Sequence, residues 1–299
     1  MKGRVVRVSG LHCMVEAADT QYRCDFRGRV KTGTRGSNSP VIVGDWVDFE
    51  PRPPAAGVVE RRYPRTSKFA RGGSDTKPYE RVVAVNLDRL IVVVAAKSPA
   101  LRPGFIDRAL VMAHKGEIDP LICVNKVDLD PAGEFEAIAD IYRKLGYPIL
   151  LTSAATGTGV AELRDLLHDR VTAFVGHSGV GKSSLLNHIE PGLALKTHEL
   201  MANHDRGRHV TTAVHLYRLS SGGGHVADTP GIKELQLHDV KPAEVVRYFV
   251  EMAPLVEECR FRDCMHLQEP GCAVLAAIEV GAVSQLRHDG YSRIIAGLR

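Results

Sequence analysis

The sequence has no long hydrophobic run. Its longest apolar stretch, residues 90–96, has the length of a β-strand, whereas a membrane-spanning helix needs about 20 consecutive apolar residues. The amino terminus is charged and lacks the apolar segment of about 7 to 15 residues that follows the charges in a secretory signal. These absences argue against a membrane protein and predict a cytoplasmic one.

The net charge is small but unevenly distributed. The 299-residue chain is 44% hydrophobic and 25% charged, which is typical of a soluble globular protein of about two domains. Residues 1–81 contain 16 Lys or Arg and 9 Asp or Glu, a balance of +7, so the remaining residues carry −3 of the net +4. Clustered cations suit a nucleic-acid partner because they displace counterions from a phosphate backbone. A well-solvated basic surface is the alternative.

Cysteine is scarce, with six in the chain, and half of them are clustered. Cys259, Cys264 and Cys272 lie within 14 residues and enclose His266. Structural disulfides are rare in the cytoplasm, so this cluster indicates a metal. Three thiolates and one imidazole form a closed tetrahedral set suited to structural Zn²⁺, with no open position for a catalytic water. A disulfide with one free thiol is the alternative.

The amino-terminal region predicts a small β-barrel. Turn signals separate short β-rich runs, which lie at residues 4–8, 13–17, 21–26 and 46–49. An oligonucleotide-binding (OB-fold) barrel over residues 1–70 has this size and binds nucleic acid through its strand face and loops. The loop at residues 31–38 is basic and glycine-rich.

A change of pattern follows the predicted barrel. Residues 61–74 are basic, contain Gly and Pro, and show neither strand nor helical periodicity. We therefore predict a linker between the barrel and the next domain, and we assign it residues 71–81 when the chain is divided into domains. It is either a flexible connector or a further contact to phosphates.

After residue 81, predicted strands and helices alternate. This alternation predicts an α/β domain over residues 82–236, with a mostly parallel sheet covered by helices on both faces. Ligands of such sheets bind at the carboxyl ends of the strands. Residues 237–299, with predicted helices at 242–256 and 273–281, form a helical zinc-binding domain.

A phosphate-loop pattern follows the predicted strand at residues 171–175 and precedes a predicted helix. Its glycines allow successive backbone N–H groups to turn towards phosphates, and the helix amino terminus adds partial positive charge. We expect Lys182 to contact the β- and γ-phosphates and the Ser183 hydroxyl to coordinate Mg²⁺. Ser184 either belongs to the site or packs at the helix start. The candidate nucleotide-binding residues here are Gly176, His177, Ser178, Gly179, Val180, Gly181, Lys182, Ser183 and Ser184.

A second motif indicates which base is bound. Asn125, Lys126, Val127 and Asp128 follow a predicted strand and have the Asn-Lys-x-Asp form of guanine-nucleotide proteins. The Asp128 carboxylate can accept two hydrogen bonds that guanine donates and adenine cannot. Ser153 and Ala154, at the next strand end, supply a loop for the guanine oxygen. Read alone, the tetrapeptide could be an ordinary polar turn; beside a phosphate loop it predicts guanine recognition.

Two further segments are candidate switches. Asp228 and Gly231 belong to an Asp-x-x-Gly motif after a predicted strand, where Asp228 would bind Mg²⁺ through water and the Gly231 N–H would face the γ-phosphate. Upstream, Thr212 or its neighbour Thr211 would coordinate Mg²⁺ only when the γ-phosphate is present.

The order of the motifs is unusual, because Asn-Lys-x-Asp and Ser-Ala precede the phosphate loop. The domain is therefore circularly permuted. Together with the basic barrel and the Cys/His cluster, this order resembles the RsgA (YjeQ) family of GTPases across essentially the whole chain. The resemblance implies a monomer that hydrolyses GTP when stimulated by the small ribosomal subunit, assists late maturation of that subunit, and contacts ribosomal RNA through the barrel and the zinc domain. Two residues depart from the family pattern: His177 replaces a glutamine, and Val210 replaces a threonine.

The residue that orients the attacking water is not evident from the motifs. Ras-like enzymes use a glutamine after Asp-x-x-Gly, but Ile232 stands there and cannot hydrogen-bond water. We therefore predict slow intrinsic turnover, with His209 as first catalytic candidate and His177 as second; either could instead contact phosphate or pack. The rival functions are an RNA-binding assembly factor gated by nucleotide, in which hydrolysis is incidental, and an ATPase.

Overall fold

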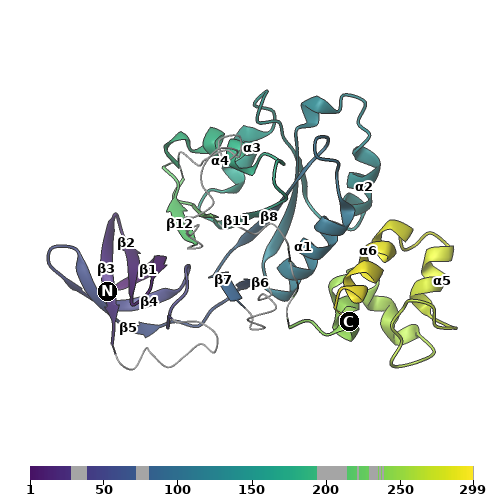
Figure 1. Cartoon of the computed structure of the whole chain (residues 1–299), viewed down its shortest axis with the longest axis horizontal. Helices are drawn as coiled ribbons and strands as arrows, with labels where there is room; N and C mark the ends of the chain where they lie inside the picture. The colour runs from purple at the N-terminus through teal and green to yellow at the C-terminus, as the bar shows by residue number, and fades with distance from the viewer. Residues whose placement is uncertain are drawn as a thin grey trace, which may run out of the picture.

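Figure 1 shows a computed structural model of the chain in three parts: an amino-terminal barrel, a central layer of strands and helices, and a carboxyl-terminal helical lobe. The structure describes residues 1–27, 39–71, 81–193, 214–220, 222–228, 235, 237 and 239–298. The basic, glycine-rich loop at residues 31–38 lies outside them. Within them, every helix is too short or too polar to cross a membrane.

Five strands form the predicted barrel. Its ring closes because β1 pairs with both β2 and β4, while β5 pairs with β3 and β4. Alternate side chains point inward, and Val5, Val15 and Val47 are fully buried in the barrel core. The expectation of a small barrel is thus confirmed. The strands are β1 (Lys2–Ser9), β2 (His12–Ala17), β3 (Thr20–Phe26), β4 (Trp46–Arg52) and β5 (Ala56–Arg62).

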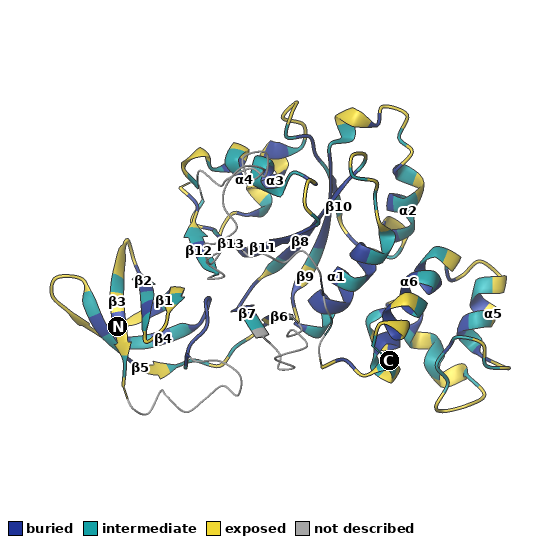
Figure 2. Cartoon of the chain, in the orientation of Figure 1, coloured by how far each residue is buried: buried dark blue, intermediate teal, exposed yellow. Residues whose placement is uncertain are grey.

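The central sheet is mostly parallel, as predicted. Its parallel strands lie in the order β10-β9-β8-β11-β13, and β12 pairs antiparallel with β13. Strands β8, β9 and β11 are mostly dark blue in Figure 2 because helices cover both faces of the sheet, whereas β12 is largely teal. These strands are β8 (Arg89–Ala95), β9 (Asp119–Asn125), β10 (Ile149–Leu151), β11 (Val171–Val175), β12 (His215–Arg218) and β13 (His225–Asp228).

The helices divide between the two faces according to the alternation of side chains along the strands. Helices α1 (Pro103–Lys115) and α2 (Glu136–Lys144) pack on the side of Val92 and Ile122. On the side of Ile91, the sheet is covered by α3 (Val160–Leu166) and α4 (Lys182–Ile189). Since both faces are buried, the strands are apolar without alternation, which explains the continuous apolar run in the sequence.

The barrel and the central sheet are hydrogen-bonded to each other. Strand β1 pairs with β12 at Arg7 and His215, so the barrel strands and the central strands form one 11-stranded sheet. Beside this junction, β6 (Lys68–Arg71) and β7 (Arg81–Val85) form a separate two-stranded sheet.

The prediction that residues 61–74 lack strand structure was wrong. Strand β5 extends to Arg62, and β6 occupies four of the later residues. The pattern was invisible in the sequence because β6 buries one large side chain, Phe69, and because its pairing partner β7 lies on the far side of residues 72–80. The domain limits at residues 70, 81 and 236 remain predictions.

The carboxyl-terminal lobe has its own core, which includes Phe249, Met252 and Tyr291. The prediction of one helix over residues 242–256 was wrong: two 3₁₀ helices, η5 (Pro242–Tyr248) and η6 (Ala253–Glu258), occupy this stretch. Pro254 lacks an N–H and disfavours the α conformation at the preceding residue, so a continuous helix cannot form. Helix α5 (Ala273–Glu279) was predicted, whereas α6 (Gln285–Ala296) was not.

Candidate functional site

The predicted nucleotide motifs meet at one edge of the central sheet. Parallel strands β9, β10, β11 and β13 all end at this edge, and each leads into one motif. The edge is also where ligands of such sheets bind. The structure therefore brings together the loops that begin at Asn125, Thr152 and Gly176 with the end of β13 at Asp228.

The phosphate loop depends on its glycines. Gly179 and Gly181 have φ values of +82° and +94°, which side chains disfavour. A Cβ at Gly176 would lie 2.4 Å from the Val93 carbonyl oxygen, so the loop can pass β8 this closely only with glycine. The Lys182 ammonium donates hydrogen bonds to the Gly176 and His177 carbonyl oxygens at 2.6 and 2.9 Å. Helix α4 starts at Lys182, and its first N–H groups face the loop.

Asn125 connects three predicted motifs through one buried side chain, which is 1% exposed. Its Nδ2 donates to the Val180 carbonyl oxygen at 2.8 Å, within the phosphate loop. Its Oδ1 accepts from the Thr152 hydroxyl at 3.2 Å and from the Ala154 N–H at 3.3 Å. Asn125 therefore supports the phosphate loop as well as the two loops that would contact the base.

Asp128 lies where a base could reach it. The residue is exposed on the 3₁₀ turn η2 (Val127–Leu129), and the Ser153 hydroxyl donates to its carboxylate. Lys126 adopts a left-handed conformation with φ +60°, and its ammonium donates to the Ser98 carbonyl oxygen. The Asn-Lys-x-Asp loop therefore has a defined, hydrogen-bonded conformation that presents the Asp128 carboxylate at the sheet edge.

His177 packs against helix α1. Its ring centroid is 4.3 Å from that of Phe105. Burial lowers the pKa of His177 below its ordinary value, and the cations of Arg102, Lys182 and Arg108 lower it further. The imidazole is therefore neutral at pH 7, and these three cations make the loop attractive to phosphate.

The loop after β8 was not recognised as part of the site. With His177 and Ser178 it lines a cavity of about 200 Å³, to which Pro99, Leu101 and Arg102 contribute. No motif marks this loop, and the only signal in the sequence is its position after a buried strand.

Several predicted residues lie outside the described part of the chain: His209, Thr211, Thr212 and Gly231. Asp228 is described as the last residue of β13, which places its backbone at the sheet edge.

The carboxyl-terminal cluster has the geometry of a metal site. One ligand atom from each of Cys259, Cys264, His266 and Cys272 lies within 4.8 Å of the others. The Sγ atoms of Cys259 and Cys272 are each 3.5 Å from His266 Nδ1 and 4.0 Å from each other. Tetrahedral Zn²⁺ with bonds of about 2.3 Å to sulfur and about 2.0 Å to nitrogen places ligand atoms roughly 3.5–3.8 Å apart. All six cysteines are described, and all are free thiols, so the four residues fit a metal rather than a disulfide.

A carboxylate stabilises the turn between the cluster's ligands. Glu269 accepts hydrogen bonds from the N–H groups of Met265, Leu267 and Gln268 at 2.9–3.0 Å. Although burial opposes ionisation, these donors lower the pKa of Glu269 to about 2. On the other side, His288 hydrogen-bonds the His266 carbonyl oxygen at 2.7 Å. The ligand backbone is thus held by neighbouring residues.

Comparison with known proteins identifies the family. Residues 2–59 match the model of the RsgA N-terminal domain, and residues 62–238 match that of the RsgA GTPase. The chain belongs to the RsgA GTPase family. The chain is 38% identical to a relative from Chlorobaculum tepidum that is named small ribosomal subunit biogenesis GTPase RsgA. The match covers 100% of this chain and 98% of the relative. In Moorella thermoacetica the identity is 38%, over 99% of this chain and 97% of the relative.

Solved structures agree with this family. YjeQ from Thermotoga maritima superposes with a TM-score of 0.81 at 35% identity, covering 99% of this chain and 98% of that one. YloQ, described as a circularly permuted GTPase, superposes with a TM-score of 0.74 at 30% identity, covering 99% and 94%. Membership of the RsgA GTPase family makes the chain a GTP hydrolase and confirms the predicted permuted GTPase fold.

Proposed function

We propose that the chain hydrolyses GTP to GDP and phosphate at the carboxyl edge of the central sheet, and assists late maturation of the small (30S) ribosomal subunit, which stimulates the reaction. The observation that carries this proposal is the set of hydrogen bonds from Asn125 to Val180, Thr152 and Ala154. A guanine nucleotide must contact the base loops and the phosphate loop at once, and one buried amide holds these loops in a fixed relation. The ribosomal role is supported by the relatives, which are named small ribosomal subunit biogenesis GTPases.

Each motif has a separate task in this proposal. Asp128 accepts hydrogen bonds from guanine, while Lys182 contacts the β- and γ-phosphates and the Gly231 N–H faces the γ-phosphate. Ser183, Thr212 and Asp228 would hold Mg²⁺, which neutralises negative charge on the phosphates when bound. Thr211 is the alternative to Thr212.

The attacking water needs a hydrogen-bonding partner other than Ile232. His209 is our first candidate. His177 is the second, since its lowered pKa leaves a neutral imidazole that can accept a hydrogen bond from water. Its stacking on Phe105 equally suits a packing role.

The barrel and the carboxyl-terminal lobe bind ribosomal RNA in this proposal, and Zn²⁺ is the metal of the Cys/His cluster. The four ligands fit that ion, and binding would stabilise the lobe that they belong to. The protein would act as a monomer in the cytoplasm, where ribosomal subunits mature.

A turnover assay tests the function. We expect slow GTP hydrolysis by the full chain, and a large acceleration on addition of purified small ribosomal subunits. Turnover that subunits leave unchanged would favour the rival RNA-binding factor with incidental hydrolysis. Competition between GTP and ATP for the site tests the ATPase alternative, because Asp128 should exclude adenine.

Histidine variants test the mechanism. H209A should abolish subunit-stimulated hydrolysis while leaving GTP affinity nearly unchanged. H177A tests the second candidate, His177, in the same assay. H188A is the matched control, since His188 is an exposed residue of helix α4. Unchanged stimulated turnover in H209A would eliminate His209 as the water-orienting group.

A further inference from the structure

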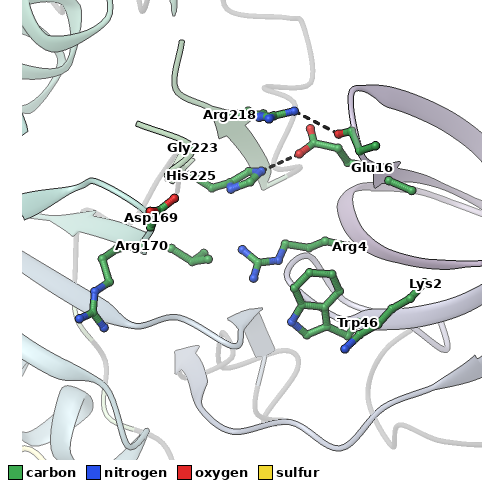
Figure 3. Close-up of a pocket in the computed structure, with 12 residues that line it drawn as sticks. Lys2, Arg4, Glu16, Trp46, Asp169, Arg170, Arg218, Gly223 and His225 are labelled. Atoms are coloured by element: carbon green, nitrogen blue, oxygen red, sulfur yellow. Dashed lines mark hydrogen bonds and ion pairs between the residues drawn. The ribbon is translucent and has the colours of Figure 1, made fainter. Parts of the chain in front are cut away.

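A cavity of about 300 Å³ lies between the barrel and the central sheet, away from the nucleotide edge and the Cys/His cluster. Figure 3 shows that Lys2, Arg4 and Trp46 reach it from the barrel, while His225 and Gly223 belong to the opposite wall. No motif of the sequence marks this cavity, because its walls come from segments about 200 residues apart.

Two cations of the cavity are held by an aromatic ring rather than by carboxylates. The Lys2 ammonium lies 4.9 Å from the centroid of Trp46, and the Arg4 guanidinium carbon lies 4.4 Å from it. Cation–π contacts orient the charges without neutralising them. Among the described residues, no carboxylate forms an ion pair with Lys2 or Arg4.

Arg4 has a buried hydrogen-bond donor, its Nε, that lacks an acceptor among the described residues. Burial lowers the pKa of Arg4 although Asp88 and Glu16 oppose this effect. An unsatisfied buried donor costs free energy, most of all when it carries charge. An anionic ligand in the cavity would stabilise the Arg4 charge, which the described residues leave incompletely partnered.

The acidic residues that line the cavity already have partners. Glu16 pairs with His225 at 2.8 Å, and Asp169 pairs with the neighbouring His168 at 3.1 Å. Their charge is therefore shared with these histidines. Four cationic side chains line the cavity, those of Lys2, Arg4, Arg170 and Arg218, against two acidic ones, so the cavity favours an anion.

We propose that this junction cavity binds a phosphate group of a single-stranded RNA chain. The inference deepens the proposed ribosomal function by placing an RNA contact between the barrel and the GTPase region. RNA is favoured over a smaller anion because the cavity has room for more than a phosphate. In addition, six of its twelve lining residues belong to the most basic segment of the sequence, residues 1–81 with a balance of +7.

The chain contains a reporter for this site. Trp46 is its only tryptophan, so intrinsic tryptophan fluorescence arises solely beside Lys2 and Arg4. The full chain, saturated with GDP to occupy the nucleotide site, is titrated with an oligouridylate of eight nucleotides. A saturable change in emission is expected, with an affinity that falls as salt rises.

Charge-removing variants then locate the contact. R4Q and K2Q should each weaken oligouridylate affinity at least fivefold. K2Q keeps the test valid if R4Q fails to fold, because Lys2 is exposed. R7Q is the matched control: Arg7 lies exposed on the same strand, carries the same charge and does not line the cavity. The oligouridylate affinity of R7Q should stay within twofold of that of the parent chain.

The outcomes are separable. Equal losses in R4Q, K2Q and R7Q, or no change in Trp46 emission, would overturn the proposal. Uridine monophosphate or inorganic phosphate binding as tightly as the oligonucleotide would also overturn it, by identifying a free phosphate compound as the ligand. Failure of small subunits to stimulate GTP hydrolysis, with oligonucleotide binding intact, would instead count against the proposed ribosomal function alone.

Discussion

Two glycines of the phosphate loop share a backbone conformation but differ in their surroundings. Gly179 and Gly181 both have positive φ values, +82° and +94°. A Cβ at Gly181 would lie 2.3 Å from Asn125 Nδ2, whereas the nearest atom to a Cβ at Gly179 is Pro99 Cδ at 3.9 Å. The second glycine is therefore required by a contact as well as by its conformation.

This difference gives a paired prediction. G179A and G181A each carry backbone strain of about 1–2 kcal/mol. G181A must also displace Asn125, which supports the base loop and the phosphate loop together. We expect G181A to lose at least tenfold more GTP affinity than G179A, measured by equilibrium titration with a fluorescent GTP analogue. Similar losses in the two variants would show that the Asn125 contact is unimportant for binding.

At the scale of elements, the β12–β13 hairpin connects the barrel to the nucleotide edge. Strand β12 pairs with β1 of the barrel, and β13 ends at Asp228. On the barrel side, Glu16 of β2 hydrogen-bonds His225 at the start of β13. The barrel is thus in contact with the strand that leads into a predicted switch, of which Asp228 is described and Gly231 is not.

The Glu16–His225 contact makes stability depend on pH. Its hydrogen bond from His225 lowers the pKa of Glu16 below the ordinary 4.5. Because the folded-state pKa is the lower one, this contribution is present above about pH 4.5 and is lost as pH falls through the folded value. We expect E16Q to be less stable by about 1 kcal/mol at pH 7, with the difference disappearing in acid.

Thermal unfolding between pH 3 and pH 7 measures this effect. E50Q is the control, since Glu50 pairs with Arg27 and Arg52 on the exposed barrel surface, where ion pairs contribute little. A stability difference between E16Q and the parent chain that is independent of pH would contradict the argument.

At the scale of the whole molecule, helix α1 joins the nucleotide site to the carboxyl-terminal lobe. Phe105 stacks on His177 at one end. Two residues later, the buried Asp107 forms an ion pair with Arg287 of α6, which also pairs with Glu251. A Cβ at Gly290 would lie 1.8 Å from Asp107 Oδ2, so this glycine allows the two helices to approach.

Removal of the buried Arg287 guanidinium should strongly lower the stability of the folded chain. R287M leaves Asp107 and Glu251 buried without their partner, which we expect to cost about 3–5 kcal/mol of unfolding free energy. Urea unfolding measures it, and R293M is the control because Arg293 is exposed on the same helix. Adding D107N and E251Q to R287M should recover part of the loss; no recovery would show that unpaired charge is not its cause.

Metal removal tests the other support of the lobe. Elemental analysis should find one metal ion per chain, and chelation should lower the thermal midpoint by roughly 5 °C or more, since metal binding contributes to folding. C272S should lose the ion. C123S is the control because Cys123 is a buried thiol of β9, remote from the cluster in the sequence. A full complement of metal in C272S would exclude the proposed ligand set.

The sequence alone determined the local chemistry of this protein. Three features are short segments that can be recognised from consecutive residues: the phosphate loop, Asn-Lys-x-Asp and the Cys/His cluster. The permuted order follows directly from the positions of these motifs along the chain. Strands with apolar faces were likewise predictable because burial imposes a pattern on consecutive residues. Helix α6 was missed because Arg287, His288 and Gly290 interrupt its apolar pattern with residues that serve contacts to other elements.

Only the tertiary structure decided which distant residues meet. The Asn125–Val180 bond, the Asp107–Arg287 pair and the cavity beside Trp46 each join segments separated by 55 residues or more. Whether a cation is paired, or a polar atom satisfied, depends on which segments pack together. Composition indicated that residues 1–81 are basic, and the fold determined that Lys2 and Arg4 face a cavity without a carboxylate partner among the described residues.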